Sequence, residues 1–106
     1  MSLRVRLTRI ARQDLAAARL YTENNWGEAQ WLRYFTVIAQ ALERIAENPD
    51  CGQQRERIGA GVRSLPVGKH LIFFESVEGY QEVVVLRIVH QSRNLAGLRF
   101  LDDLEG

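Results

Sequence analysis

Two arginines and a histidine stand in and just after the most apolar stretch of the chain. Arg87, His90 and Arg93 interrupt or follow the run "VVVLRIV", and Arg63 lies ahead of a second apolar run. Guanidinium groups bind phosphate and carboxylate through paired hydrogen bonds, and an imidazole transfers protons near neutral pH. If these side chains converge, the arginines can hold an anion and His90 can act as an acid or base.

A structural role is the alternative for the same residues. A charged side chain inside so apolar a strand needs a carboxylate, carbonyl groups or a ligand anion as its partner, so an internal salt bridge accounts equally well for Arg87. Strict alternation places His90 on the face of Leu86 and Ile88. Arg87 then lies on the opposite face. For His90 we therefore favour a structural or partner-contacting role over that of a general acid or base.

Other residues whose side chains could take part in binding or catalysis have simpler interpretations. Trp26 precedes Gly27, which favours an aromatic plug at a turn, although an exposed tryptophan would be a strong binding anchor. His70 follows Lys69 at the start of a predicted strand, and Cys51 is a lone thiol in a polar loop. The chain has no glycine-rich phosphate loop, no paired carboxylates and no metal-ligand spacing. We expect no metal and no cofactor.

Length and composition predict one soluble domain over residues 1–106. The 14 basic residues nearly balance the 13 acidic ones, and 46% of the residues are hydrophobic. No stretch reaches the roughly 18 apolar residues of a membrane span, and no signal-peptide core precedes the first charged residues. We expect a cytoplasmic protein. The second half is slightly basic, which suits an acidic protein partner as well as nucleic acid.

The N-terminal half predicts a strand and two helices. Residues 3–8 alternate as an edge strand does, and Thr8 can cap the helix that follows. Asn24, Asn25 and Gly27 are expected to end that helix. The second helix has an apolar stripe and must stop near Asn48, because Pro49 follows. The stripe consists of Trp31, Leu32, Phe35, Ile38, Ala39, Leu42, Ile45 and Ala46.

The C-terminal half predicts antiparallel strands. Turns at Gly68-Lys69 and Gly79 separate "GVRSLPV", "HLIFFES" and "EVVVLRIVH", and Pro66 confines the first run to an edge or a bulge. The last strand is apolar on both faces, so both need cover. The predicted fold is α+β and two-layered, with an N-terminal strand and an αα-hairpin packed on a small antiparallel sheet. The helices cover one face, and a partner is one candidate for the other.

The assembled pattern resembles the ParE branch of the RelE/ParE toxin superfamily of bacterial type II toxin-antitoxin modules. The resemblance rests on "ARQDLAAARLY", "NWGEAQWLRYFTVIAQALERIAENPDCG", "GVRSLPVGKHLIFFE" and "VLRIVHQSRN", in that order and spacing. It implies a helical hairpin on an antiparallel sheet and a ParD-like antitoxin whose C-terminal segment wraps the toxin.

Three functions follow from this resemblance. The leading expectation is a toxin that inhibits DNA gyrase by protein contact, without catalysis, through Arg63, Arg87, His90, Arg93 and Trp26. The second is a ribosome-dependent, metal-independent mRNA endonuclease, in which Arg63, Arg87 and Arg93 bind phosphate and His90 is the acid or base. The last tyrosine, Tyr80, lies before the strand end, and the missing C-terminal phenol weakens that alternative. The third is a non-toxic module that binds its antitoxin to regulate their operon.

Overall fold

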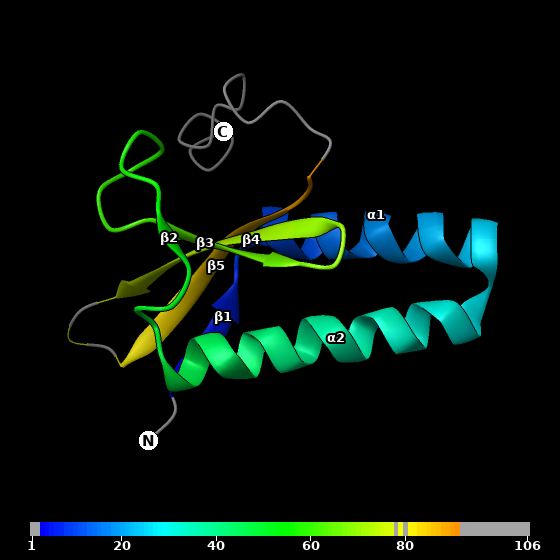
Figure 1. The fold of residues 1–106 in the computed structure, drawn as a ribbon, viewed down its shortest axis with the longest axis horizontal. Coiled ribbons are helices and arrows are strands. Elements are labelled where there is room, and N and C mark those ends of the chain that lie inside the picture. Colours follow the sequence, from blue (N-terminus) through cyan, green and yellow to red (C-terminus); the bar gives the residue numbers. More distant parts are fainter. Residues whose placement is uncertain (1–2, 78, 80, 92–106) are drawn as a thin grey trace.

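The described residues form a five-stranded sheet with two helices across one face (Figure 1). The structure is a computed structural model that describes residues 3–77, 79 and 81–91. The elements are β1 Arg4–Leu7, α1 Arg9–Trp26, α2 Glu28–Glu47, β2 Gln53–Gln54, β3 Arg63–Val67, β4 His70–Val77 and β5 Glu82–His90. The predicted α+β fold with an αα-hairpin on a sheet is confirmed.

The sheet is antiparallel except at one edge. Its strand order is β1-β5-β4-β3-β2, and β1 pairs in parallel with β5 while every other pair is antiparallel. The first strand is therefore an edge strand, as predicted. β2 pairs only with Arg63 and Ser64, so Pro66 lies where β3 has no neighbour on that side. The missing N–H of proline leaves no unpaired ladder position there.

A β-bulge interrupts β5 at Leu86. Val85 pairs with Phe74 and Arg87 pairs with Phe73, so Leu86 has no partner on β4. An extra residue of this kind shifts the alternation of side chains by one position. The carbonyl of Leu86 accepts a hydrogen bond from the Thr8 hydroxyl at 2.9 Å.

The bulge makes the expected alternation wrong beyond Leu86. Val85 and Ile88 both pack in the cluster beneath the helices, whereas Leu86 and Val89 pack on the opposite face. Leu86 and Ile88 therefore lie on different faces, although the sequence suggested one. His90 remains on the face of Ile88, toward the helices.

The turn between the helices is a single glycine. α1 continues through Asn24 and Asn25, which the sequence suggested would end it, and the Asn25 amide donates to the carbonyl of Tyr21 within the helix. Gly27 has φ +89° and ψ 169°, a conformation almost exclusive to glycine. Its N–H donates to Glu23 O, so this residue alone ends α1 and begins α2. The hairpin is tighter than predicted.

α2 buries its inner face and exposes its flank. Trp31, Ile38 and Ile45 are buried, and the helix ends at Glu47 as Pro49 requires. Leu32 and Phe35 are 55% and 40% exposed, because they line a shallow groove of about 400 Å³ against α1. Neither α1 nor α2, the helices of the described part of the chain, is long and apolar enough to cross a membrane.

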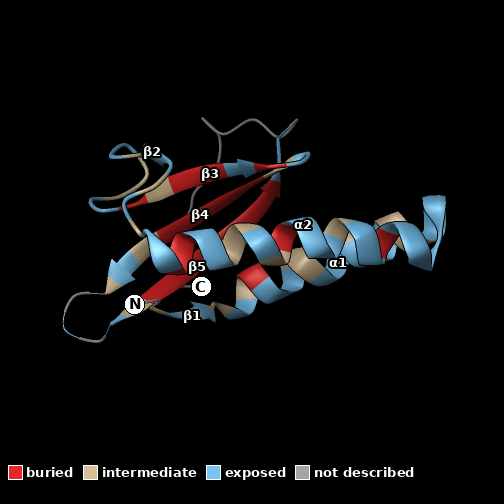
Figure 2. Ribbon diagram, turned by 60° about the horizontal axis from the view of Figure 1, so that its bottom comes forward, coloured by how far each residue is buried: buried red, intermediate tan, exposed pale blue. Residues whose placement is uncertain are grey.

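Both faces of β5 are buried (Figure 2). One cluster lies under the helices and includes Ile38, Ile45 and Phe74. A second cluster lies on the far face, where Ile58 and Val62 from the β2–β3 connection pack against the sheet. The chain itself thus covers part of the face for which a partner was considered.

Candidate functional site

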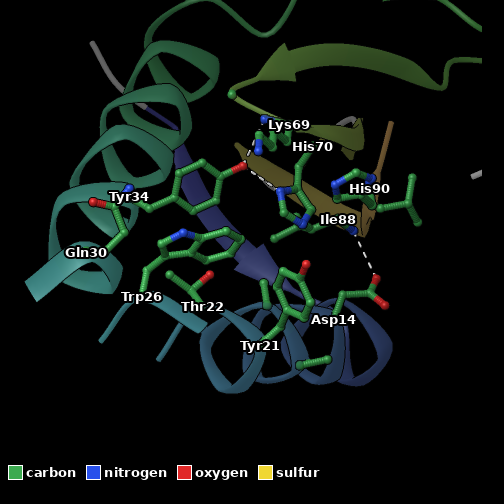
Figure 3. Close-up of a pocket in the computed structure, with 14 residues that line it drawn as sticks. Asp14, Tyr21, Thr22, Trp26, Gln30, Tyr34, Lys69, His70, Ile88 and His90 are labelled. Carbon is green, nitrogen blue, oxygen red and sulfur yellow. Dashed lines mark hydrogen bonds between the residues drawn. The ribbon is translucent and has the colours of Figure 1, made fainter. Parts of the chain in front are cut away.

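A groove of about 850 Å³ lies where β4 begins and β5 ends (Figure 3). The outer parts of α1 and α2 form its walls, and the β3–β4 turn closes one side. We call it the strand-end groove. Its lining residues are Asp14, Ala17, Ala18, Tyr21, Thr22, Trp26, Gln30, Tyr34, Gly68, Lys69, His70, Ile88, Val89 and His90.

Both histidines of the chain lie in this groove, although nothing in the sequence indicated that they are neighbours. His70 and His90 are directly opposed on β4 and β5. Their ring centroids are 5.3 Å apart with an interplanar angle of 77°, an edge-to-face arrangement. Burial lowers the pKa of His70 below its ordinary value; His90 lowers it further, and the Asp14 carboxylate opposes the shift. The neutral form of His70 is thereby favoured.

The bulge is responsible for this pairing. Counting ladder pairs outward from the Val77–Glu82 pair beside the turn would set His70 opposite Val89. The unpaired Leu86 shifts the register by one residue, so His70 meets His90 instead. A bulge position is not visible in an apolar run such as "VVVLRIV", which is why sequence reasoning missed the pair.

Tyr34 brings a phenol to the histidines from α2. Its hydroxyl oxygen lies 2.5 Å from Nδ1 of His70 and accepts the Lys69 N–H at 3.1 Å. It also lies 3.3 Å from the Val67 carbonyl oxygen. Burial raises the pKa of Tyr34, and the bond from the Lys69 amide opposes this. The phenol therefore stays protonated at neutral pH, and its role here is to orient His70.

Arg87 is held by α1. Its Nε donates to Asp14 Oδ2 at 2.9 Å and its Nη2 donates to Asp14 Oδ1 at 3.1 Å, a two-pronged pair. The Arg87 side chain is almost fully buried. Arg87 is not among the lining residues, whereas Asp14 is. This geometry matches the internal salt bridge considered for Arg87.

Arg63 has a different set of partners. Its guanidinium donates to the carbonyl oxygens of Asp50, Cys51 and Gly52, in the loop after α2. Arg63 is on β3 and Arg87 on β5, with β4 between them, so neighbouring-strand spacing alone separates their backbones by about 10 Å. The two arginines do not share an anion site in this arrangement. Arg93 lies outside the described residues.

Trp26 stands at the rim of the groove, in the last turn of α1. It is 59% exposed, beside Tyr21, which is 61% exposed, and the two rings meet edge to face at 5.7 Å. Nζ of Lys69 lies 5.9 Å from the Trp26 ring centroid. The sequence suggested an aromatic plug; the exposure fits the binding anchor that was its alternative.

The lining of the groove combines apolar, aromatic and polar side chains. Apolar walls, exposed aromatic rings and a few polar groups are typical of binding sites. Within residues 3–77, 79 and 81–91, no three His, Cys, Asp or Glu side chains form a preassembled metal centre. Cys51, partly buried in the loop after α2, is not among the groove residues.

The fold is similar to that of chains in two solved toxin-antitoxin structures. A chain of the structure described as "Chromosomal ParDE TA system from P. aeruginosa" matches with a TM-score of 0.70 at 25% identity, covering 84% of this chain and 96% of that one. The toxin-antitoxin complex RelBE2 from Mycobacterium tuberculosis shares the fold, with a TM-score of 0.57 at 23% identity over 85% of this chain and 99% of that one.

The sequence comparisons narrow the class to one family. Toxin ParE1 of Caulobacter vibrioides is 37% identical over 89 residues, which cover 84% of this chain and 90% of that toxin. Toxin ParE of Escherichia coli is 28% identical over 100 residues, covering 94% and 95%. The family model described as "ParE toxin of type II toxin-antitoxin system, parDE" matches residues 5–95. The chain belongs to the ParE toxin family of type II toxin-antitoxin systems.

Proposed function

We propose that this toxin inhibits DNA gyrase in the bacterial cytoplasm by protein contact and that a ParD-like antitoxin neutralises it. The observation that carries the proposal is that two candidate arginines already have hydrogen-bond partners within the protein. Arg87 is hydrogen-bonded to Asp14, and Arg63 is hydrogen-bonded to backbone carbonyls, so neither guanidinium group is available to bind a phosphate. A catalyst of RNA cleavage needs positive charge free to meet the reacting phosphate.

The exposed surface supports contact as the mode of action. Trp26 and Tyr21 present aromatic area at the rim of the strand-end groove, and tryptophan and tyrosine are common anchors of protein interfaces. The ParDE and RelBE2 structures come from toxin-antitoxin assemblies, which supports an antitoxin as one partner. An antitoxin that covers a recognition surface would prevent contact with the target.

The test is expression without antitoxin, with growth, gyrase supercoiling and cleavage of ribosome-bound mRNA followed in parallel. We expect growth arrest, loss of supercoiling by the purified toxin, and intact mRNA. Toxin premixed with the cognate antitoxin should leave supercoiling intact. Growth arrest with normal supercoiling would refute gyrase as the target, and full growth despite tight antitoxin binding would leave only a regulatory role.

One observation favours the endonuclease as the second candidate. Tyr34 supplies a phenol beside His70 and His90, a group that the sequence reading found missing near the strand end. The raised pKa of Tyr34 disfavours a phenolate base, so a histidine would have to carry the proton transfer, and His90 is the candidate in this alternative. Cleavage of mRNA that disappears in His90→Ala, with gyrase unaffected, would establish this alternative over the leading one.

A further inference from the structure

The two histidines form a cross-strand pair that opens into the strand-end groove. They are directly opposed in the β4–β5 ladder, and side chains at such positions share a face with Cβ atoms about 5 Å apart. His90 is exposed and His70 is partly buried, and both line the groove. The pair is therefore accessible to a small ligand from solvent.

The spacing of the rings suits one shared metal ion. Two imidazole nitrogens that bind a tetrahedral ion at 2.0–2.1 Å place their ring centroids about 5 Å apart. The centroids of His70 and His90 are 5.3 Å apart. A shared ion requires one nitrogen of each ring to point to a common centre.

Tyr34 already orients one of the two rings. Its hydroxyl engages Nδ1 of His70, which directs Nε2 away from α2 and into the groove (Figure 3). Metal-binding histidines commonly have their second ring nitrogen fixed by a hydrogen bond of this kind, and the partner sets the tautomer and the ring angle. His70 thus has the outer support expected of a ligand.

We propose that His70 and His90 bind one divalent transition-metal ion, of the zinc, nickel or copper class. Imidazole nitrogen is a preferred donor for these ions and a poor one for magnesium or calcium. The nearby Asp14 carboxylate is already bound by Arg87 and by the Ile88 N–H, so water fills the remaining coordination positions. The proposal does not depend on the target of the toxin.

The binding test is calorimetric titration of the chelator-treated full chain with Zn²⁺ in a buffer that does not bind metals. A Cys51→Ser background removes the thiol as a competing ligand. We expect one ion per chain, with binding lost in His70→Ala and in His90→Ala. Tyr34→Phe should weaken binding by about tenfold, because the supporting hydrogen bond is gone. Lys69→Ala, in the same groove, is the matched control and should bind normally.

A spectroscopic readout separates this site from binding elsewhere. Substoichiometric Cu²⁺ should broaden the ring proton signals of His70 and His90 together, and its electron paramagnetic resonance spectrum should show two nitrogen ligands. Circular dichroism of each variant establishes that it is folded. No Zn²⁺ binding, or binding that persists when both histidines are replaced, would overturn the proposal and leave the rings as an edge-to-face packing pair.

Discussion

Asp14 joins α1 to β5 through Arg87 at the point where β1 has ended. Its carboxylate accepts two guanidinium hydrogen bonds and, through Oδ2, the backbone N–H of Ile88 at 3.0 Å. β1 pairs with β5 only as far as Val85, so the part of β5 around Ile88 would otherwise present an unpaired edge. One side chain on a helix thus takes over a ladder position and neutralises a buried charge.

Breaking this pair should destabilise the fold strongly. Asp14→Ala leaves the Arg87 charge and the Ile88 N–H without their described partner, and we expect a loss of about 3 kcal/mol in the free energy of unfolding. The exposed pair Arg19–Glu23 is the control, and Arg19→Ala should change stability by less than about 0.5 kcal/mol. Urea denaturation measures both. Equal effects would contradict a structural role for the Asp14–Arg87 pair.

Two glycine substitutions should distinguish the stability lost to a strained backbone conformation from the stability lost to a steric clash of the new Cβ atom. Gly27→Ala imposes a side chain on a conformation that only glycine adopts readily, yet the new Cβ would meet no atom within 4 Å, so a loss of about 1–3 kcal/mol is expected. Gly52 has a similar φ of +81°, but its Cβ would lie 2.3 Å from the backbone oxygen of Ser64. Gly52→Ala should therefore be clearly the worse variant in thermal unfolding. The reverse order would show that the loop at Gly52 relaxes freely.

His70 should titrate below the usual histidine range in the metal-free protein. Burial and the nearby His90 disfavour its charged form, so its folded pKa is lower than its unfolded pKa. The resulting contribution to stability is present above the unfolded pKa of about 6.5 and is lost as pH falls through the folded value. NMR titration of the ring protons measures this. His90→Ala should raise the pKa of His70, and a wild-type value at or above 6.5 would contradict the argument.

Trp26→Ala should impair recognition while the fold remains intact. The ring is mostly exposed, so thermal stability should change by less than about 0.5 kcal/mol. As an interface anchor it should contribute about 2 kcal/mol to binding the antitoxin, a loss measurable by calorimetry. Leu20→Ala is the matched control, because Leu20 is equally exposed on α1 but lines neither groove. Similar losses from both variants would argue against Trp26 as an anchor.

The fold was predictable from the sequence because its signals are local. The Thr8 cap, the stop before Pro49 and the turn at Gly68-Lys69 each depend on a few adjacent residues, and the structure has all three. Asn24 and Asn25 were misleading. Their preference for turns is weak, and the helix continues through them, with the Asn25 side-chain amide donating to the Tyr21 carbonyl one turn earlier.

The site was harder to predict because it depends on register and on contacts between distant segments. Arg87 was recognised as needing a partner, but nothing in the sequence singles out Asp14, which lies 73 positions away. Tyr34 appeared only as one residue of an amphipathic helix, and His70 only as a strand end. Their meeting depends on how α2 crosses β4, which periodicity does not specify.

Because Leu86 is unpaired, the residues of β5 before and after it pair with β4 in registers that differ by one residue. In protein engineering terms, the bulge is a spare position: deleting Leu86 would leave a regular ladder in which Arg87 still pairs with Phe73 and His90 still pairs with His70. The first half of β5, already paired on both sides, would keep its neighbours. The floor of the groove would thus tolerate the loss of one residue from the strand that forms it.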